Sequence, residues 1–243
     1  MKTLTHPALC LAALLSIGAA TAGAASISVT DPDMNNAFTF NYFIGTQTAA
    51  DNLVATSGPD ARAFSNDGVE GFRNATGLIH PEAADGDPRT IVFHFDPAPG
   101  LIITGATVYS ASLIVDPDGG SATAADFIKG YWSTDNVSYK DGPLVDDPFL
   151  EVLGDGPNSN TSTIDLASDG FTGGADLYLK YVLQRDADNV LRHQLFRSTD
   201  DDNGFIVNLT LAQAPIAAIP EPSTLMLLVL GAIGLAWAAR RRR

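Results

Sequence analysis

Cysteine is almost missing from this chain of 243 residues, which contains only Cys10. The residues after it can therefore form neither disulfides nor thiolate metal sites. Acylation of Cys10, as in a lipoprotein, is an alternative that the neighbouring residues disfavour. That signal wants a small residue just before the cysteine, where Leu9 stands, and the apolar run that should precede it is almost absent.

Basic residues are scarce as well. Residues 26–219 hold 9 Lys and Arg against 27 Asp and Glu, a formal charge of −18. This balance argues against nucleic acid or anionic lipid as a partner, because both are polyanions. Nearly all the acids of this body are Asp, which favours turns and strand ends over strand interiors. The composition is typical of an exported all-β domain.

Patterns that signal catalysis are absent from the sequence. No Gly-x-Ser-x-Gly nucleophile elbow occurs. The histidines at 80, 94 and 193 show no His-x-His or His-Glu-x-x-His spacing, so a zinc site is not expected. A glycosidase needs two positioned carboxylates, and nothing selects a pair among so many aspartates. A secreted hydrolase of that kind stays open as the alternative function.

Convincing helical periodicity and repeats are also missing from the body, where "SATAADFI" favours at most one helical turn. Apolar residues instead alternate with polar ones between turn signals, which predicts strands. The clearest sets that share a face are Ile91, Phe93 and Phe95; Leu177, Leu179, Tyr181 and Leu183; and Phe205, Val207, Leu209 and Leu211. We expect an antiparallel β-sandwich of jelly-roll type over residues 26–212.

The N-terminal segment 1–25 has the layout of a secretory signal peptide. Lys2 precedes an apolar run from Ala8 to Ala20, and small residues follow it. The run is too short to span a bilayer, which takes about 20 apolar residues. Cleavage is expected after Ala24 or Ala25. The body is therefore predicted to be exported.

The C-terminal segment combines three parts in order. A linker, 213–223, contains Pro220, Glu221 and Pro222; an uncharged run of 16 residues, 224–239, follows; and Arg240, Arg241, Arg242 and Arg243 end the sequence. The run makes about 24 Å of helix, and flanking arginines can snorkel to the headgroups, so we expect a transmembrane helix. The arginines orient it with this end in the cytoplasm. The alternatives are an ordinary tail anchor or a buried helix with a charged end, but a buried core helix would not be apolar all round and end in four arginines.

The segment "PEPSTLMLLVLGAIGLAWAARRRR" resembles the PEP-CTERM sorting signal of Gram-negative bacteria. The resemblance implies that a membrane-embedded cysteine transpeptidase, exosortase, recognises the Pro-Glu-Pro and processes the tail. It also implies a bacterium that makes exopolysaccharide. The resemblance covers only the last 24 residues. It therefore predicts where the protein goes and leaves the function of the body open.

The stretch "GYWSTDNVSYK" is the most suggestive motif of the body. It resembles the strand–turn pattern of discoidin-like, galactose-binding jelly rolls and, loosely, the Asp-boxes of sialidases. In such patterns the Asp and Ser bond the turn backbone while the aromatics pack, which is the structural interpretation. The functional interpretation is that Tyr131, Trp132 or Tyr139 stacks on a sugar ring.

Clustered aspartates suggest calcium, which takes six to eight oxygen ligands. The best cluster is Asp116, Asp118 and Asp126 in "DPDGGSATAAD", although Pro117 and the missing late acidic ligand depart from an EF-hand loop. Aspartates that only cap turns are the alternative. No other cofactor is expected. Together the patterns predict a non-catalytic protein of the cell surface or extracellular matrix, associated with exopolysaccharide.

Overall fold

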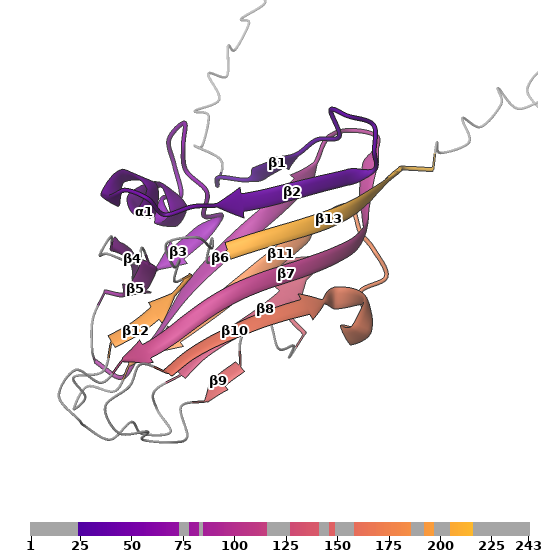
Figure 1. Ribbon diagram of the computed structural model, residues 1–243. Coiled ribbons are helices and arrows are strands. Elements are labelled where there is room, and N and C mark those ends of the chain that lie inside the picture. The colour runs from indigo at the N-terminus through magenta and orange to yellow at the C-terminus, as the bar shows by residue number, and fades with distance from the viewer. Residues whose placement is uncertain are drawn as a thin grey trace, which may run out of the picture.

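The computed structural model describes residues 24–72, 78–82, 85–115, 127–140, 146–148, 158–185, 192–196 and 205–215. These parts of the chain form two layers of strands that lie one behind the other (Figure 1). The predicted all-β class is confirmed. The predicted signal peptide, except its last residues, and the whole tail from residue 216 lie outside the described residues.

The first sheet has the strand order β1-β6-β11-β8-β9, and β3 also pairs with β6. Its strands are β1 (Ile27–Val29), β3 (Ser65–Asp67), β6 (Pro88–Pro97), β8 (Phe127–Ser133), β9 (Asp146–Pro148) and β11 (Leu177–Gln184). All of these pairs are antiparallel except that of β1 with β6, which is parallel.

The second sheet has the order β2-β13-β7-β12-β5-β4, and β10 pairs with β7. Its strands are β2 (Ala37–Tyr42), β4 (Val69–Phe72), β5 (Leu78–Pro81), β7 (Leu101–Val115), β10 (Asn158–Asp165), β12 (Arg192–Leu195) and β13 (Phe205–Gln213). The long strand β7 pairs with β13 and then with β12 along its length.

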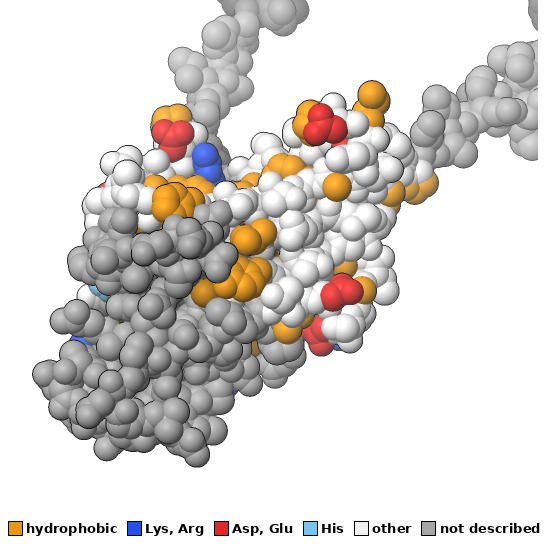
Figure 2. Space-filling model, in the orientation of Figure 1, with side chains coloured by type: hydrophobic (Ala, Val, Ile, Leu, Met, Phe, Trp, Pro, Cys, Tyr) orange, Lys and Arg blue, Asp and Glu red, His pale blue; other side chains and the backbone are white. Residues whose placement is uncertain are grey.

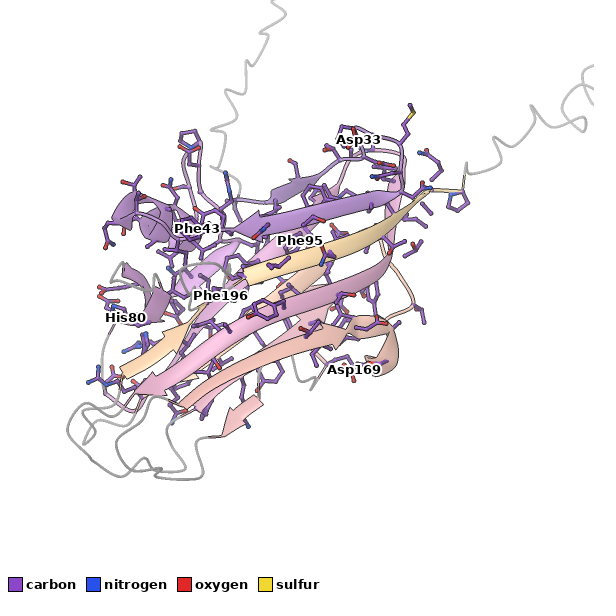
Figure 3. The ribbon with its side chains drawn as sticks, viewed as in Figure 1. Asp33, Phe43, His80, Phe95, Asp169 and Phe196 are labelled. Atoms are coloured by element: carbon purple, nitrogen blue, oxygen red, sulfur yellow. The ribbon has the colours of Figure 1, made fainter. Side chains whose placement is uncertain are left out.

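The core lies between the sheets, where the predicted apolar faces meet. The inward residues of β6, β11 and β13 named above are all buried, so the alternation predicted their orientation correctly. Aromatic rings join the layers: Phe93 of β6 lies 5.0 Å from Phe205 of β13, and Phe196 stacks on Phe205 at 4.1 Å. Figure 3 places Phe95 and Phe196 in this interior. Each such ring pair contributes about 0.5–1.5 kcal/mol beyond its burial.

One polar contact crosses the core. The hydroxyls of Ser110 on β7 and Tyr181 on β11 lie 2.7 Å apart, and neither side chain has any exposed surface. Burial raises the pKa of Tyr181. A buried hydroxyl must be hydrogen-bonded to avoid a large desolvation cost, so this pair fixes how the two sheets face each other.

Two details differ from the sequence-based expectation. A helix, α1 (Gln47–Val54), occupies a stretch where none was expected; its N-cap Thr46 accepts from the backbone N–H of Ala49. The helix is only 8 residues long, so its buried Ala50 and Leu53 are too few to show a period. In "GYWSTDNVSYK", which resembles a strand–turn pattern, the residues after the turn form only an isolated bridge, from Trp132 to Lys140.

The outer face of the second sheet is mostly uncharged and polar. Figure 2 shows few charged side chains over β2, β13 and β7. Thr39, Asn41, Asn208 and Thr210 are exposed there, and Thr39 Oγ1 donates to Asn208 Oδ1 at 2.9 Å. The outer face of the first sheet differs, because aromatic and basic side chains gather on it.

Candidate functional site

The turn after β8 is held by its own side chains. Asp135 Oδ1 accepts hydrogen bonds from the backbone N–H groups of Val137 and Ser138, each at 2.8 Å, and from Ser133 Oγ at 2.7 Å. These bonds, led by that from Ser138, lower the pKa of Asp135 to about 2. The structural interpretation of the "STDN" turn thus matches the contacts in the structure.

Asn136 adopts the left-handed conformation, with φ of 58°, where glycine is usual and Asn is tolerated. Its side-chain oxygen accepts a hydrogen bond from the Tyr139 hydroxyl. The chain then returns alongside β8, and the backbone N–H of Lys140 donates to the carbonyl of Trp132 at 2.9 Å. Tyr139 is therefore fixed against the outer edge of the first sheet.

The three aromatic residues of the motif point to different sides. Trp132 faces inward with only 5% of its surface exposed. Its indole Nε1 donates to Asp169 Oδ2 at 2.6 Å, and its ring meets Phe171 edge-on at 5.5 Å. Asp169 lies on the 3-10 helix Leu166–Asp169, η1, that follows β10 (Figure 3). Trp132 therefore has no ring face to offer a sugar, whereas Tyr131 points outward and is half-buried.

Lys180 links the two tyrosines of the motif. The register of β11 and β8 places it directly opposite Tyr131. Its Nζ lies 5.0 Å from the ring centre of Tyr131 and 3.8 Å from that of Tyr139. A cation so close to two aromatic rings is attracted by both. Burial, with smaller effects from Tyr178 and Asp135, raises the pKa of Tyr139 to about 12.

Tyr178 extends this surface across β11. It stacks on His94 of β6, with ring centres 4.3 Å apart and planes at 4°. Phe64 meets both rings edge-on, at 5.3 Å and 5.5 Å. We call Tyr131, Tyr139, Tyr178 and Lys180 the aromatic platform.

The sequence motif pointed to only part of the platform. Tyr178 and Lys180 lie far from "GYWSTDNVSYK" along the chain. The alternation in "LYLKYVLQ" was the signal that they face outward, away from the core. Only the strand pairing shows that they adjoin the motif.

A chain of hydrogen bonds ends the platform at His94. Ser26 Oγ lies 2.8 Å from His94 Nδ1, and His94 Nε2 lies 2.8 Å from Asp176 Oδ1. The hydroxyl thus meets Nδ1 and the carboxylate meets Nε2, the reverse of the order in Ser-His-Asp hydrolases. His94 is only 8% exposed. The contacts hold the start of β1 to the sheet and also bring a hydroxyl to an imidazole.

A pocket of about 570 Å³ opens beside Ser26. Its lining contains Ala25 to Ser28, Phe40 and part of the segment 58–62, including Arg62. Among the described residues, none of those that line this pocket is acidic. It therefore does not supply the carboxylate pair that the glycosidase alternative requires.

Several predicted sites lie outside the described residues. These are the calcium candidates Asp116, Asp118 and Asp126, the sorting residues Pro220 to Pro222, and the arginines 240–243. Where the structure does describe the chain, no three His, Cys, Asp or Glu side chains gather as a metal-binding set. No helix within those same residues is long and apolar enough to cross a membrane.

Comparison with known families identifies the motif at the C-terminal end of the chain. Residues 218–243 match the family model described as the PEP-CTERM protein-sorting motif. The chain carries a PEP-CTERM sorting signal. It is therefore an exported protein that exosortase sorts to the cell surface or beyond it. No curated protein matches the chain, so the role of the body has to be argued from its own structure.

Proposed function

We propose that the PEP-CTERM protein is a non-catalytic protein of the cell surface or extracellular matrix that binds exopolysaccharide through the aromatic platform. The contact that carries the proposal is Lys180 Nζ held against the rings of Tyr131 and Tyr139. Sugars present apolar ring faces that pack on aromatic rings, and hydroxyls that hydrogen-bond to polar neighbours. The platform offers both on a rigid sheet.

The rigidity of the platform supports binding. Tyr131 and Tyr178 stand on paired strands, and Tyr139 is fixed by the hydrogen bond to Asn136. Side chains that are ordered before binding lose little entropy when the ligand arrives. The sequence also offered Trp132 as a residue that stacks on a sugar ring. Because this ring is buried, we propose a structural role for Trp132 beside the turn instead.

Sorting completes the proposal. Residues 1–25 serve as a signal peptide, and 224–239 hold the chain in the inner membrane until exosortase removes the tail. The sandwich is of jelly-roll type, and Asp116, Asp118 and Asp126 offer a calcium site in one of its loops. The released body then meets the polysaccharide outside the cell.

Glycan binding by the full chain, purified in mild detergent, tests the platform. Tyr131→Ala and Tyr139→Ala should each weaken binding about fivefold, since an aromatic contact contributes about 1 kcal/mol. Tyr109→Ala is the matched control, because Tyr109 lies on the outer side of β7 in the other sheet, opposite Ile206 and Thr163. Equal binding by all three variants and the parent chain would refute the platform as the site.

A second function, hydrolysis, is favoured by one observation. Ser26 hydrogen-bonds His94, which in turn hydrogen-bonds Asp176. In an ester hydrolase of this kind Ser26 would attack the acyl carbonyl while His94 takes the hydroxyl proton. His94 would pass that proton to the alcohol as its C–O bond breaks, and water would then release the acid from Ser26. Labelling by a fluorophosphonate that is lost in Ser26→Ala would support it. If the chain is not labelled, hydrolysis is refuted, and these hydrogen bonds serve only to hold the start of β1 to the sheet.

A further inference from the structure

Two of the three lysines of the body lie on the outer face of the first sheet. Residues 26–219 hold only three lysines, Lys129, Lys140 and Lys180. Lys129 lies on β8 and Lys180 on β11, while Lys140 follows the turn and bridges to Trp132. Against the 27 acidic residues of the same body, this grouping places positive charge where the aromatic rings are.

Two of these lysines lie against aromatic rings. Lys180 Nζ is 5.0 Å and 3.8 Å from the ring centres of Tyr131 and Tyr139, and Lys129 Nζ is 5.3 Å from that of Phe127. Lys129 lies in register with Asp146 of β9, at the edge of the sheet. Lys140 is exposed. Lys180, between the two tyrosines, is thus the best-placed cation for a bound sugar.

We infer that the sugar bound by the platform is acidic and that Lys180 binds its carboxylate, an inference that rests on the proposed function. A uronic acid ring has an apolar face for the tyrosine ring and a carboxylate at its edge, where the ammonium of Lys180 lies. Charge-assisted hydrogen bonds of this kind are stronger than those between neutral groups.

Nearby acids set where this ring can lie. Asp176 lies beside Tyr178, because its carboxylate is 2.8 Å from Nε2 of His94, the ring on which Tyr178 stacks. Asp135 lies in the same turn as Asn136, which accepts a hydrogen bond from Tyr139. Like charges placed face to face are costly. The acidic ring therefore stacks over Tyr131 and Lys180 on the β8 side, and the His94 end of the platform contacts uncharged parts of the polymer.

The net charge of the body opposes the binding of an acidic polymer. At −18 over residues 26–219, the body as a whole repels polyanions, which is why the sequence argued against nucleic acid and anionic lipid. A polyuronate can bind only if a local site outweighs that repulsion. Removal of one lysine should then have a large effect on binding.

The experiment compares polygalacturonate with its methyl ester, in which each carboxylate is replaced by an uncharged ester group. The full chain in mild detergent should bind the free acid about tenfold more tightly than the ester, as one charged hydrogen bond implies. Lys180→Met should remove this preference, because it weakens binding of the free acid more than binding of the ester. Lys180→Arg should keep it, and Arg62→Met, which loses the same charge beside the Ser26 pocket, should also keep it.

The outcomes separate this inference from the proposed function. If both polymers bind equally, or if Lys180→Met keeps the preference, the acidic-sugar inference is overturned while the platform remains a glycan site. If neither polymer binds and neutral glycans do, the same holds. If no glycan binds at all, both fall. A preference lost in Lys180→Met and kept in Arg62→Met supports the acidic sugar.

Discussion

The hydrogen bond between Ser110 and Tyr181 offers a sharp test of how the two sheets are joined. The two hydroxyls lie 2.7 Å apart with no exposed surface on either side chain. Ser110→Ala leaves the phenol without this partner, and Tyr181→Phe does the same to the serine. A buried hydroxyl that loses its partner costs about 1–3 kcal/mol.

The double variant should lose less unfolding free energy than the sum of the two single losses. When both partners become apolar, no buried hydroxyl is stranded, and the change can be nearly neutral. We expect each single variant to lose about 2 kcal/mol of unfolding free energy and the double variant about the same or less. A coupling energy of about 2 kcal/mol or a little more follows, within the range for residues in contact.

Urea unfolding of the full chain in mild detergent, followed by far-UV circular dichroism, measures these values. A loss of about 2 kcal/mol should lower the melting temperature by about 4–8 °C for a domain of this size. Ser168→Ala, on the exposed 3-10 helix, is the control and should change little. If the double variant loses the full sum of the single losses, the hydroxyls do not interact and the reasoning is refuted.

Four further predictions follow from the contacts and the motif. Gly71→Ala should destabilise the fold by about 1–3 kcal/mol, because its Cβ would lie 2.4 Å from the backbone of α1; unchanged urea unfolding would contradict this. The pKa of Asp135 is lowered to about 2, so its ionised carboxylate stabilises the fold above about pH 4, and this stabilisation is lost as the pH falls through 2. Asp135→Asn should therefore flatten the pH dependence of stability between pH 4 and 2. The same pH dependence in the variant and the parent chain would contradict this. Changing Pro220 and Pro222 to Ala should leave unprocessed chain in the membrane, and intact-mass analysis would disprove it by finding a mature, shortened product. If the 116–126 loop binds calcium, millimolar calcium should raise the melting temperature by several degrees, whereas equal shifts in sodium at matched ionic strength would leave only screening.

The sequence predicted the strands whose side chains alternate, for a physical reason. In β6, β11 and β13 one face meets the other sheet, so apolar residues recur at every second position. The same rule makes Tyr131 and Trp132 face opposite ways, and only the core contacts decide which one points inward. The turn at Asp135 could also be read locally, because its side chain bonds neighbouring backbone.

What the sequence could not show depends on contacts between distant segments. The platform forms because β11 pairs with β8 and β6, which brings Tyr178 beside His94. No local pattern records that pairing. The parallel pairing of β1 is equally hidden, since three residues cannot show a direction. Helix α1 was not predicted because it is short and because its N-cap residue, Thr46, is of a type that is also common in turns.

The place of β13 constrains the order of events during secretion. This last strand lies between β2 and β7 in the second sheet, and it ends at Gln213, shortly before the Pro-Glu-Pro at 220–222. The sheet cannot close until the segment next to the sorting signal has crossed the membrane. Almost the whole body must therefore be outside the membrane before this sheet can form.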